Sequence, residues 1–163
     1  SEMCIRDRLR IKCTGGVELQ SKAMKIFTLF AVGALIYGMI EISVRGFTHI
    51  TMGLLGGLAM VMIHLLNDER RRGMNYFLQL LIAASFITAI EFFAGEILNR
   101  RLQMNIWDYS DIPLNFDGQI CLPFVFLWII LAAIGTALDD LIRWKMFKEP
   151  RNFSYIKNKR TAF

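Results

Sequence analysis

The chain has 163 residues, of which 55% are hydrophobic, and it carries a formal net charge of +5. A length of this order suggests one domain, and the apolar fraction and the mean hydropathy of +0.41 indicate a membrane protein. The basic residues lie at the ends of apolar blocks and in the C-terminal tail, a pattern of membrane flanks that argues against a nucleic-acid-binding protein.

The first 24 residues are expected to form a disordered segment outside the membrane domain, because Ser1–Gln20 shows no sustained hydrophobic periodicity. Within it, Met3–Arg8 reads like a translated adapter from a sequencing library, so we interpret the start of the chain as an artefact and assign it no function. A signal peptide is not expected, because no small-residue cleavage site follows the first apolar block and further apolar blocks come after it.

Four apolar blocks separated by charged clusters predict an all-α, polytopic membrane protein with a bundle of four transmembrane helices. The blocks are Ile26–Val44, Ile50–Leu66, Tyr76–Leu98 and Ile120–Ile142. Crossing a hydrocarbon core of about 30 Å takes about 20 residues at about 1.5 Å each, and the second block only just satisfies this requirement. We therefore expect a transmembrane domain over residues 25–147 and a basic cytoplasmic tail over residues 148–163.

The distribution of Lys and Arg predicts that both termini are cytoplasmic, because the side of a membrane protein richer in these residues faces the cytoplasm. The basic residues on the richer side are Lys22, Lys25, Arg70, Arg71, Arg72, Arg143, Lys145, Lys148, Arg151, Lys157, Lys159 and Arg160, and those on the other side are Arg45, Arg100 and Arg101. The loops 45–49 and 99–119 then face outward. We expect a multi-pass membrane protein.

Small residues recur four positions apart in three of the blocks, in Gly53–Gly57, Ala34–Gly38 and Ala133–Ala137. This spacing allows helix backbones to approach closely. Packing between helices of the same chain is the favoured interpretation, and a homodimer face is the alternative.

Acidic residues inside the apolar blocks need partners, because a charge in a membrane helix costs about 2.5–3.5 kcal/mol on insertion scales. Glu41 and Arg45 are four residues apart, as are Glu96 and Arg100, and this spacing suits ion pairs on one helix face. Glu91 lies about two turns inside the end of its helix and has no local basic partner. We predict that Glu91 faces the bundle interior and is either protonated or paired across helices, and we predict Arg45 as its partner.

The loop before the fourth block is rich in aromatic and turn-forming residues. Trp107, Tyr109 and Phe116 are natural anchors at the membrane interface, and Asp117-Gly118 predicts a tight turn. We expect this loop to fold onto the membrane, either as an anchored connector or as a cap over a polar pocket of substrate-binding or structural residues. The residues of this predicted cluster are Glu41, Arg45, His49, Glu91, Asn99, Trp107, Asp108, Tyr109, Asn115 and Gln119.

The spacing of cysteine and histidine indicates neither a metal site nor a disulfide framework. Cys121 stands at a helix start, where a thiol pKa can be lowered, but a packing role is favoured. His64 lies close to Asp68 at the cytoplasmic end of the second block, and we interpret it as structural.

Sequence motifs of common soluble enzymes are absent, among them G-x-x-x-x-G-K-[ST], G-x-S-x-G, H-E-x-x-H and G-x-G-x-x-G. The chain is therefore not expected to bind ATP through a P-loop or to carry a cofactor. An enzymatic role is less favoured than a non-enzymatic one.

A distinctive set of residues is spread over the helix ends and the outer loop. The set consists of Glu41–His49, Gly56-Gly57, Glu91-Phe92, Gly95, Asn99, Trp107–Ser110, Pro113, Asn115 and Gly118–Cys121. In these residues the chain resembles a bacterial family of small multi-pass proteins labelled putative ABC transporter permease, type IV. The resemblance covers about Lys25–Trp144, and the tryptophan loop is its most specific part. The resemblance implies a membrane-embedded subunit of a bacterial cytoplasmic (inner) membrane that works with a separate ATPase. A transporter built from only four helices would oligomerise or recruit other subunits.

We expect a permease-like integral membrane component of a transport system, paired with a separate ATPase, for a substrate that no motif identifies. The alternative is a membrane enzyme or accessory subunit that acts on a lipid or lipid-linked substrate at the outer leaflet. A purely structural or regulatory membrane partner is a third possibility. A bound ATPase would favour the first function, turnover by the isolated protein the second, and a large stable complex with neither property the third.

Overall fold

The computed structural model describes residues 2–150, so most of the expected basic tail lies outside the described residues. Its helices are α1 (Glu2–Arg45), α2 (Ile50–Arg72), α3 (Tyr76–Gly95) and α4 (Leu122–Lys145), and α3 continues as a short π-helix, η1 (Glu96–Arg101). Two antiparallel strands, β1 (Asn115–Phe116) and β2 (Ile120–Cys121), form a small hairpin before α4.

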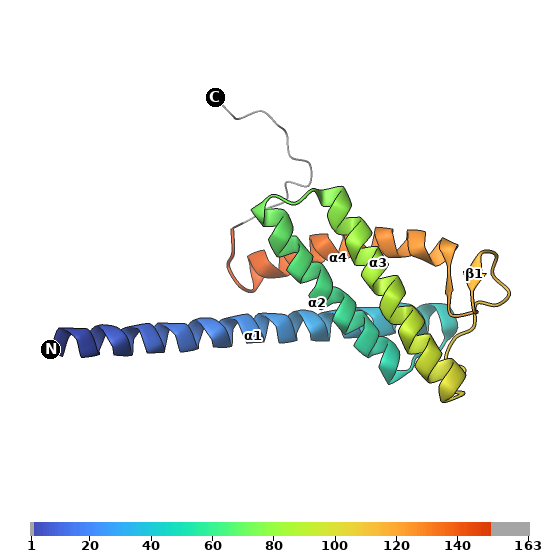
Figure 1. Ribbon diagram of the computed structural model, residues 1–163, viewed down its shortest axis with the longest axis horizontal. Coiled ribbons are helices and arrows are strands. Elements are labelled where there is room, and N and C mark those ends of the chain that lie inside the picture. The colour runs from blue at the N-terminus through green and yellow to red at the C-terminus, as the bar shows by residue number, and fades with distance from the viewer. Residues whose placement is uncertain (1, 151–163) are drawn as a thin grey trace, which may run out of the picture.

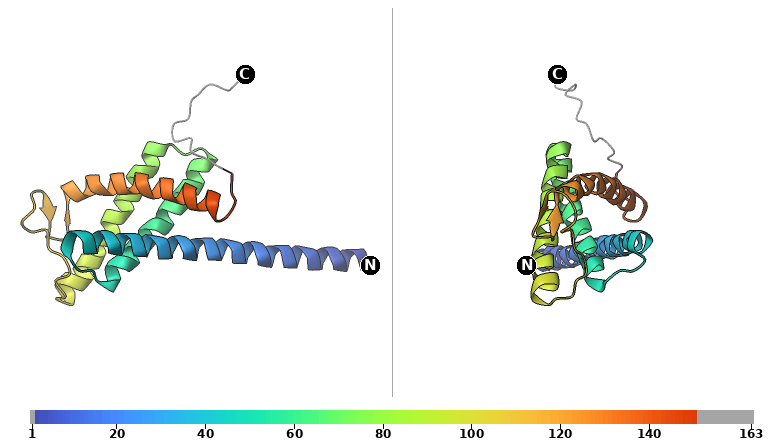
Figure 2. Two further views of the ribbon diagram at one scale, coloured as in Figure 1. Left: turned by 180° about the vertical axis from the view of Figure 1, so that it is seen from behind. Right: turned by 90° about the vertical axis from the view of Figure 1, so that its right-hand side faces the viewer.

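The four helices form two layers (Figure 1). Helices α2 and α3 lie side by side in one layer, and α1 and α4 cross them in the other, as the views from behind and from the side also show (Figure 2). The packing predicted between small residues of the same chain is found for Gly53 of α2, which faces Ala34 of α1, whereas Gly57 faces the ring of Phe30 and a Cβ atom at Gly38 would meet nothing within 4 Å. The close approach of these two helices fixes one wall of the bundle.

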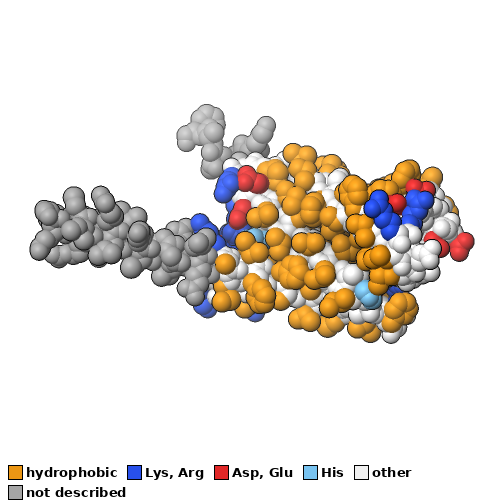
Figure 3. All heavy atoms as spheres, turned by 60° about the horizontal axis from the view of Figure 1, so that its bottom comes forward, with side chains coloured by type: hydrophobic (Ala, Val, Ile, Leu, Met, Phe, Trp, Pro, Cys, Tyr) orange, Lys and Arg blue, Asp and Glu red, His pale blue; other side chains and the backbone are white. Residues whose placement is uncertain are grey.

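All four helices are long and apolar enough to cross a membrane. The spans are Lys22–Arg45, Ile50–Arg72, Tyr76–Arg101 and Leu122–Lys145. Hydrophobic side chains cover the middle of the bundle surface and charged side chains gather at its two ends (Figure 3), as expected for a protein whose middle is surrounded by lipid. The predicted all-α bundle with four membrane-spanning helices is therefore confirmed, and the chain is a multi-pass membrane protein.

Helix ends follow local capping chemistry. Asn75 caps α3, because its side-chain oxygen accepts a hydrogen bond of 2.8 Å from the backbone N–H of Phe77. Gly73 ends α2 with a φ of 126°, which an L-residue with a side chain rarely adopts. Helix α4 begins two residues later than predicted, because Ile120–Cys121 pairs with β1, and Pro123 then occupies the first turn as expected.

The N-terminal segment differs from the expectation. Residues 1–24 were expected to be disordered, whereas the backbone is helical from Glu2 and continuous with the first span, so α1 projects beyond the bundle (Figure 1). No proline occurs between residues 2 and 45. Once the membrane span has formed, a helix can extend from it without a second nucleation step, and only Gly15-Gly16 opposes that extension strongly.

The bundle offers a direct test of the proposed orientation, because its loops gather at two opposite ends. We predict that a reporter fused after Gly73, in the turn between α2 and α3, is active in the cytoplasm, and that one fused after Asp111 is active outside. The reason is the excess of basic residues at the Gly73 end. Paired alkaline phosphatase and fluorescent-protein fusions make the measurement, and a cytoplasmic signal at Asp111 would contradict the orientation.

Candidate functional site

The predicted ion pair between Glu41 and Arg45 is present near the end of α1. Their closest atoms, Arg45 Nη1 and Glu41 Oε1, are 2.6 Å apart. Arg45 also donates a hydrogen bond to the backbone carbonyl of Ile106, and Glu41 accepts one from the hydroxyl of Thr48. Because Ile106 belongs to the outer loop, this pair ties the loop to α1.

Glu91 is buried, as predicted, with 4% of its surface exposed. The prediction that it pairs with Arg45 is wrong. The hydroxyl of Tyr109 donates to Glu91 Oε1 at 3.0 Å, and the indole N–H of Trp128 donates to Oε2 at 2.9 Å. Arg45 is instead held by Glu41 and the outer loop, so the carboxylate of α3 lies between a donor from the loop and a donor from α4.

Asn99 of η1 anchors the outer loop against the bundle. Its side-chain nitrogen donates to the carbonyl of Trp107 at 2.9 Å and to Gln119 Oε1 at 3.0 Å, and its oxygen accepts from the N–H of Ile106 at 2.7 Å. The indole of Trp107 in turn donates to the carbonyl of Gln119 at 3.1 Å. The loop therefore folds onto the end of the bundle through a set of buried polar contacts, and its predicted contact with the membrane stays a prediction.

Tyr109 connects this loop to the bundle interior. Its ring stacks on Phe124 of α4 with the ring centroids 4.7 Å apart. Burial, and then the neighbouring Glu91 carboxylate, raise the pKa of Tyr109 far above its ordinary value. The hydroxyl therefore stays protonated and remains a hydrogen-bond donor to Glu91.

Three residues of the predicted cluster make local hydrogen bonds in the loops and at a helix end. His49 caps α2, with its Nδ1 2.8 Å from the hydroxyl of Thr51. Asp108 accepts hydrogen bonds from the hydroxyl and the N–H of Ser110, and both bonds lower the pKa of its carboxyl. Asn115 donates to the carbonyl of Ser110 at 3.0 Å. These contacts shape the turns, and none of the three residues lines the cavity described below.

Two further predictions are confirmed at the end of the bundle that carries this loop. Glu96 and Arg100 form the expected pair, with 3.0 Å between their closest atoms, on an exposed helix face. Cys121 is a free, buried thiol with 2% of its surface exposed, as expected of a packing cysteine.

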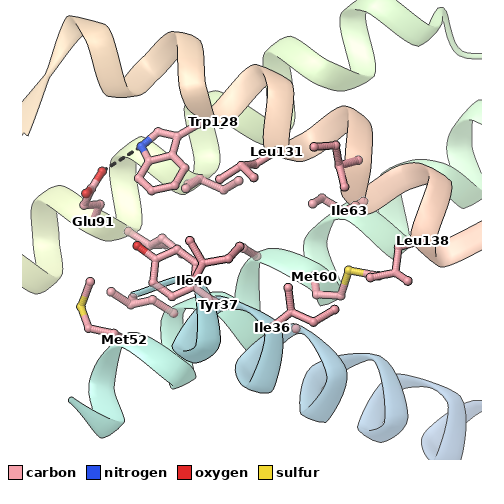
Figure 4. Close-up of a pocket in the computed structure, with 18 residues that line it drawn as sticks. Ile36, Tyr37, Ile40, Met52, Met60, Ile63, Glu91, Trp128, Leu131 and Leu138 are labelled. Carbon is pink, nitrogen blue, oxygen red and sulfur yellow. Dashed lines mark hydrogen bonds between the residues drawn. The ribbon is translucent and has the colours of Figure 1, made fainter. Parts of the chain in front are cut away.

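A cavity of about 130 Å³ lies inside the membrane part of the bundle (Figure 4). Its lining comes from all four helices and is mostly aliphatic. Glu91, Trp128 and Tyr37 lie toward one end, and Leu138 and Met60 lie toward the other (Figure 4). The sequence predicted Glu91 as a site residue, but it did not predict Trp128 or Tyr37.

The cavity opens sideways between α1 and α4. Ile36 and Ile40 of α1 and Ile134 of α4 line it and are also exposed at the outer surface of the bundle. In a membrane this surface faces lipid, because it belongs to the middle of two spans.

The opposite end of the bundle contains a second buried polar cluster, which the sequence did not predict. We call it the inner network, and its members are His64, Asn67, Arg70, Asp139, Asp140 and Arg143. The side chain of Asp139 lies 2.8 Å from His64 Nδ1 and accepts from Asn67 at 2.6 Å. Asp140 accepts from Arg70 at 2.8 Å. The network therefore joins α2 to α4.

Two neighbouring residues at this end of α2, His64 and Asp68, contact different residues of α4. His64 contacts Asp139, whereas Asp68 pairs with Arg143 at 2.6 Å. Arg143 also pairs at 2.6 Å with Glu149, which follows α4 and contacts Lys25 of α1. Burial raises the pKa of Glu149, but these two cations outweigh it and leave the pKa below its ordinary value. These ion pairs join α1, α2 and α4 at this end of the bundle. The inner network and Glu149 therefore have a structural role.

Among residues 22–150, no group of three or more His, Cys, Asp or Glu side chains is arranged to hold a metal ion.

The comparisons with known proteins match the chain to a family. The model of the family described as "Putative ABC-transporter type IV" matches residues 34–156. This stretch contains the C-terminal part of α1 (residues 34–45), the whole of α2, α3 and α4, and the outer loop. No curated protein and no solved structure matches the chain.

Proposed function

This chain belongs to the family described as Putative ABC-transporter type IV, and from that premise we propose that it is a permease-like membrane component of a transport system and works with a separate ATPase. The observation that carries the proposal is the cavity inside the bundle with the buried carboxylate of Glu91 in its wall. Ligand sites are mostly apolar cavities with a few placed polar groups, and an ionisable residue inside a membrane span marks a functional site.

The contacts at the two ends of the bundle support a lateral route to this cavity. The outer end is covered by the loop that Asn99 and Arg45 hold in place, and the inner end is fastened by the inner network. The gap between α1 and α4 faces lipid and is lined by Ile36, Ile40 and Ile134. A substrate that partitions into the bilayer suits this arrangement better than one that arrives from water.

An ATPase would contact the cytoplasmic end, and the last turn of α2 offers it an exposed charged pair. Glu69 and Arg72 are 2.6 Å apart and their side chains are 53% and 73% exposed. We predict that exchanging these two charges, by Glu69→Arg with Arg72→Glu, removes the ATPase from the purified complex while leaving the fold intact. The reason is that the exchange keeps the ion pair between the two positions but reverses the order of positive and negative charge that a binding partner would contact. Purification in mild detergent, followed by mass spectrometry and an ATP hydrolysis assay, measures the effect.

The matched control is the same exchange in the outer pair, Glu96→Arg with Arg100→Glu, which should leave the ATPase bound. An ATPase absent from the wild-type complex would contradict the proposed function.

The lipid-facing opening of the cavity also favours the second candidate, a membrane enzyme or accessory subunit acting on a lipid. Turnover of a lipid by the purified chain without ATP would support that candidate instead.

A further inference from the structure

Glu91 is a buried carboxylate without a cationic partner among the described residues. The neighbouring base, Arg45, is already occupied by Glu41 and the carbonyl of Ile106. Glu91 accepts one hydrogen bond on each oxygen, whereas a carboxylate offers about four lone-pair sites. A buried acidic group in a membrane span is costly unless it is paired, so this site has room and electrostatic preference for a cation.

Two aromatic rings flank the same end of the cavity. Tyr37 and Trp128 both line it, with their ring centroids 6.2 Å apart (Figure 4). The hydroxyl of Tyr37 forms no hydrogen bond with any described residue, and the indole N–H of Trp128 is fixed by Glu91. Aromatic faces attract ammonium groups, most strongly when the site is dry. The rings therefore add to the preference that the carboxylate creates.

The rest of the cavity is an apolar track between α1 and α4. Its α4 wall runs from Trp128 to Leu138, ten residues along the helix, or about 15 Å. Gly33 and Gly135 also line it, and at each of them the absent side chain makes room for a side chain of α2, Met60 beside Gly33 and Ile63 beside Gly135. The shape suits a single extended hydrocarbon chain better than a bulky or branched molecule.

We propose that the cavity binds an amphiphilic cation, namely a single hydrocarbon chain with an ammonium group at one end. The ammonium group pairs with Glu91 and contacts the rings of Tyr37 and Trp128, and the chain lies along α4 toward Leu138. This deepens the proposed function and rests on it, because it names the class of substrate that the permease-like component would take from the bilayer.

The test uses the full chain in nanodiscs of zwitterionic phosphatidylcholine, which has no net charge. Radiolabelled dodecylamine is the probe, and empty discs give the background. We expect saturable uptake of about one dodecylamine per chain by the wild type. Glu91→Gln should weaken this uptake by at least about tenfold, because the cation loses its counter-charge. Glu96→Gln, which removes an acidic group outside the cavity, should leave it unchanged.

A second variant keeps the proposal testable if Glu91→Gln fails to fold. Ala59 lines the cavity, so Ala59→Phe should block the track, whereas Ala137→Phe on the exposed face of α4 should not.

Three results would overturn the proposal. The first is uptake by the wild type no greater than uptake by empty discs, and the second is equal saturable uptake of uncharged dodecanol. A dimer whose second copy fills the groove and excludes dodecylamine would also overturn it. Capture of the ATPase without amine binding would refute this inference and leave the proposed function standing. Amine binding without capture of the ATPase would contradict the proposed function and leave the amine site standing.

Discussion

Replacing Asp139 by alanine is expected to lower the free energy of unfolding by about 3–5 kcal/mol, because one member of a buried charged cluster would be removed. The Asp139 side chain is fully buried and contacts His64 at 2.8 Å and Asn67 at 2.6 Å, with Arg143 3.6 Å away. In the variant these three partners stay in the bundle and lose this acceptor, while Asn67 keeps Asp140 and Arg143 keeps Asp68 and Glu149. Unfolding in increasing SDS, followed by the loss of helical circular dichroism, measures the change.

Asp111→Ala is the matched control, because Asp111 lies exposed in the outer loop and should tolerate the same change with an effect below about 0.5 kcal/mol. A loss for Asp139→Ala no larger than for this control would contradict the structural role of the inner network. Replacing Asp139 and His64 together by leucine should recover part of the loss, because an apolar pair leaves fewer unsatisfied groups than a broken polar one.

The inner network also shows why part of this architecture could not be predicted from the sequence. The four spans were predictable, because each depends only on the apolar character of its own residues. The Glu41–Arg45 and Glu96–Arg100 pairs were predictable for a similar reason, since four residues on one helix fix their geometry. Asp139 and His64 are 75 residues apart, and their contact depends on how α2 and α4 are rotated about their axes.

The same limit explains the wrong partner for Glu91. Its burial followed from its position in the span, but its donors come from Tyr109 in the loop and Trp128 in α4. A signal was available for Trp128, because tryptophan favours the membrane interface and an indole N–H in the middle of a span needs an acceptor. That reasoning indicates a buried acceptor without identifying which one.

Helix α1 provides a second test, in which two identical substitutions should have opposite effects. A Cβ atom at Gly33 would lie 2.4 Å from the Cβ of Met60 and 2.7 Å from the carbonyl oxygen of Gly56, both closer than atoms can pack. At Gly38 it would meet nothing within 4 Å. We predict that Gly33→Ala destabilises the bundle by about 1–3 kcal/mol through overpacking, and that Gly38→Ala stabilises it by up to about 1 kcal/mol through helix propensity.

The Gly33 effect should be this large because its neighbours on α2 are backbone and the first side-chain carbon, which cannot rotate away. Helix α1 would have to move off α2, and the wall that Gly33 and Tyr37 give to the cavity would move with it. Gly33→Ala should therefore weaken dodecylamine uptake as well as stability, whereas Gly38→Ala should leave uptake unchanged. SDS unfolding and the nanodisc assay measure both effects on the same preparations. Equal changes in the two variants would mean that α1 and α2 do not approach each other at Gly33 in the membrane.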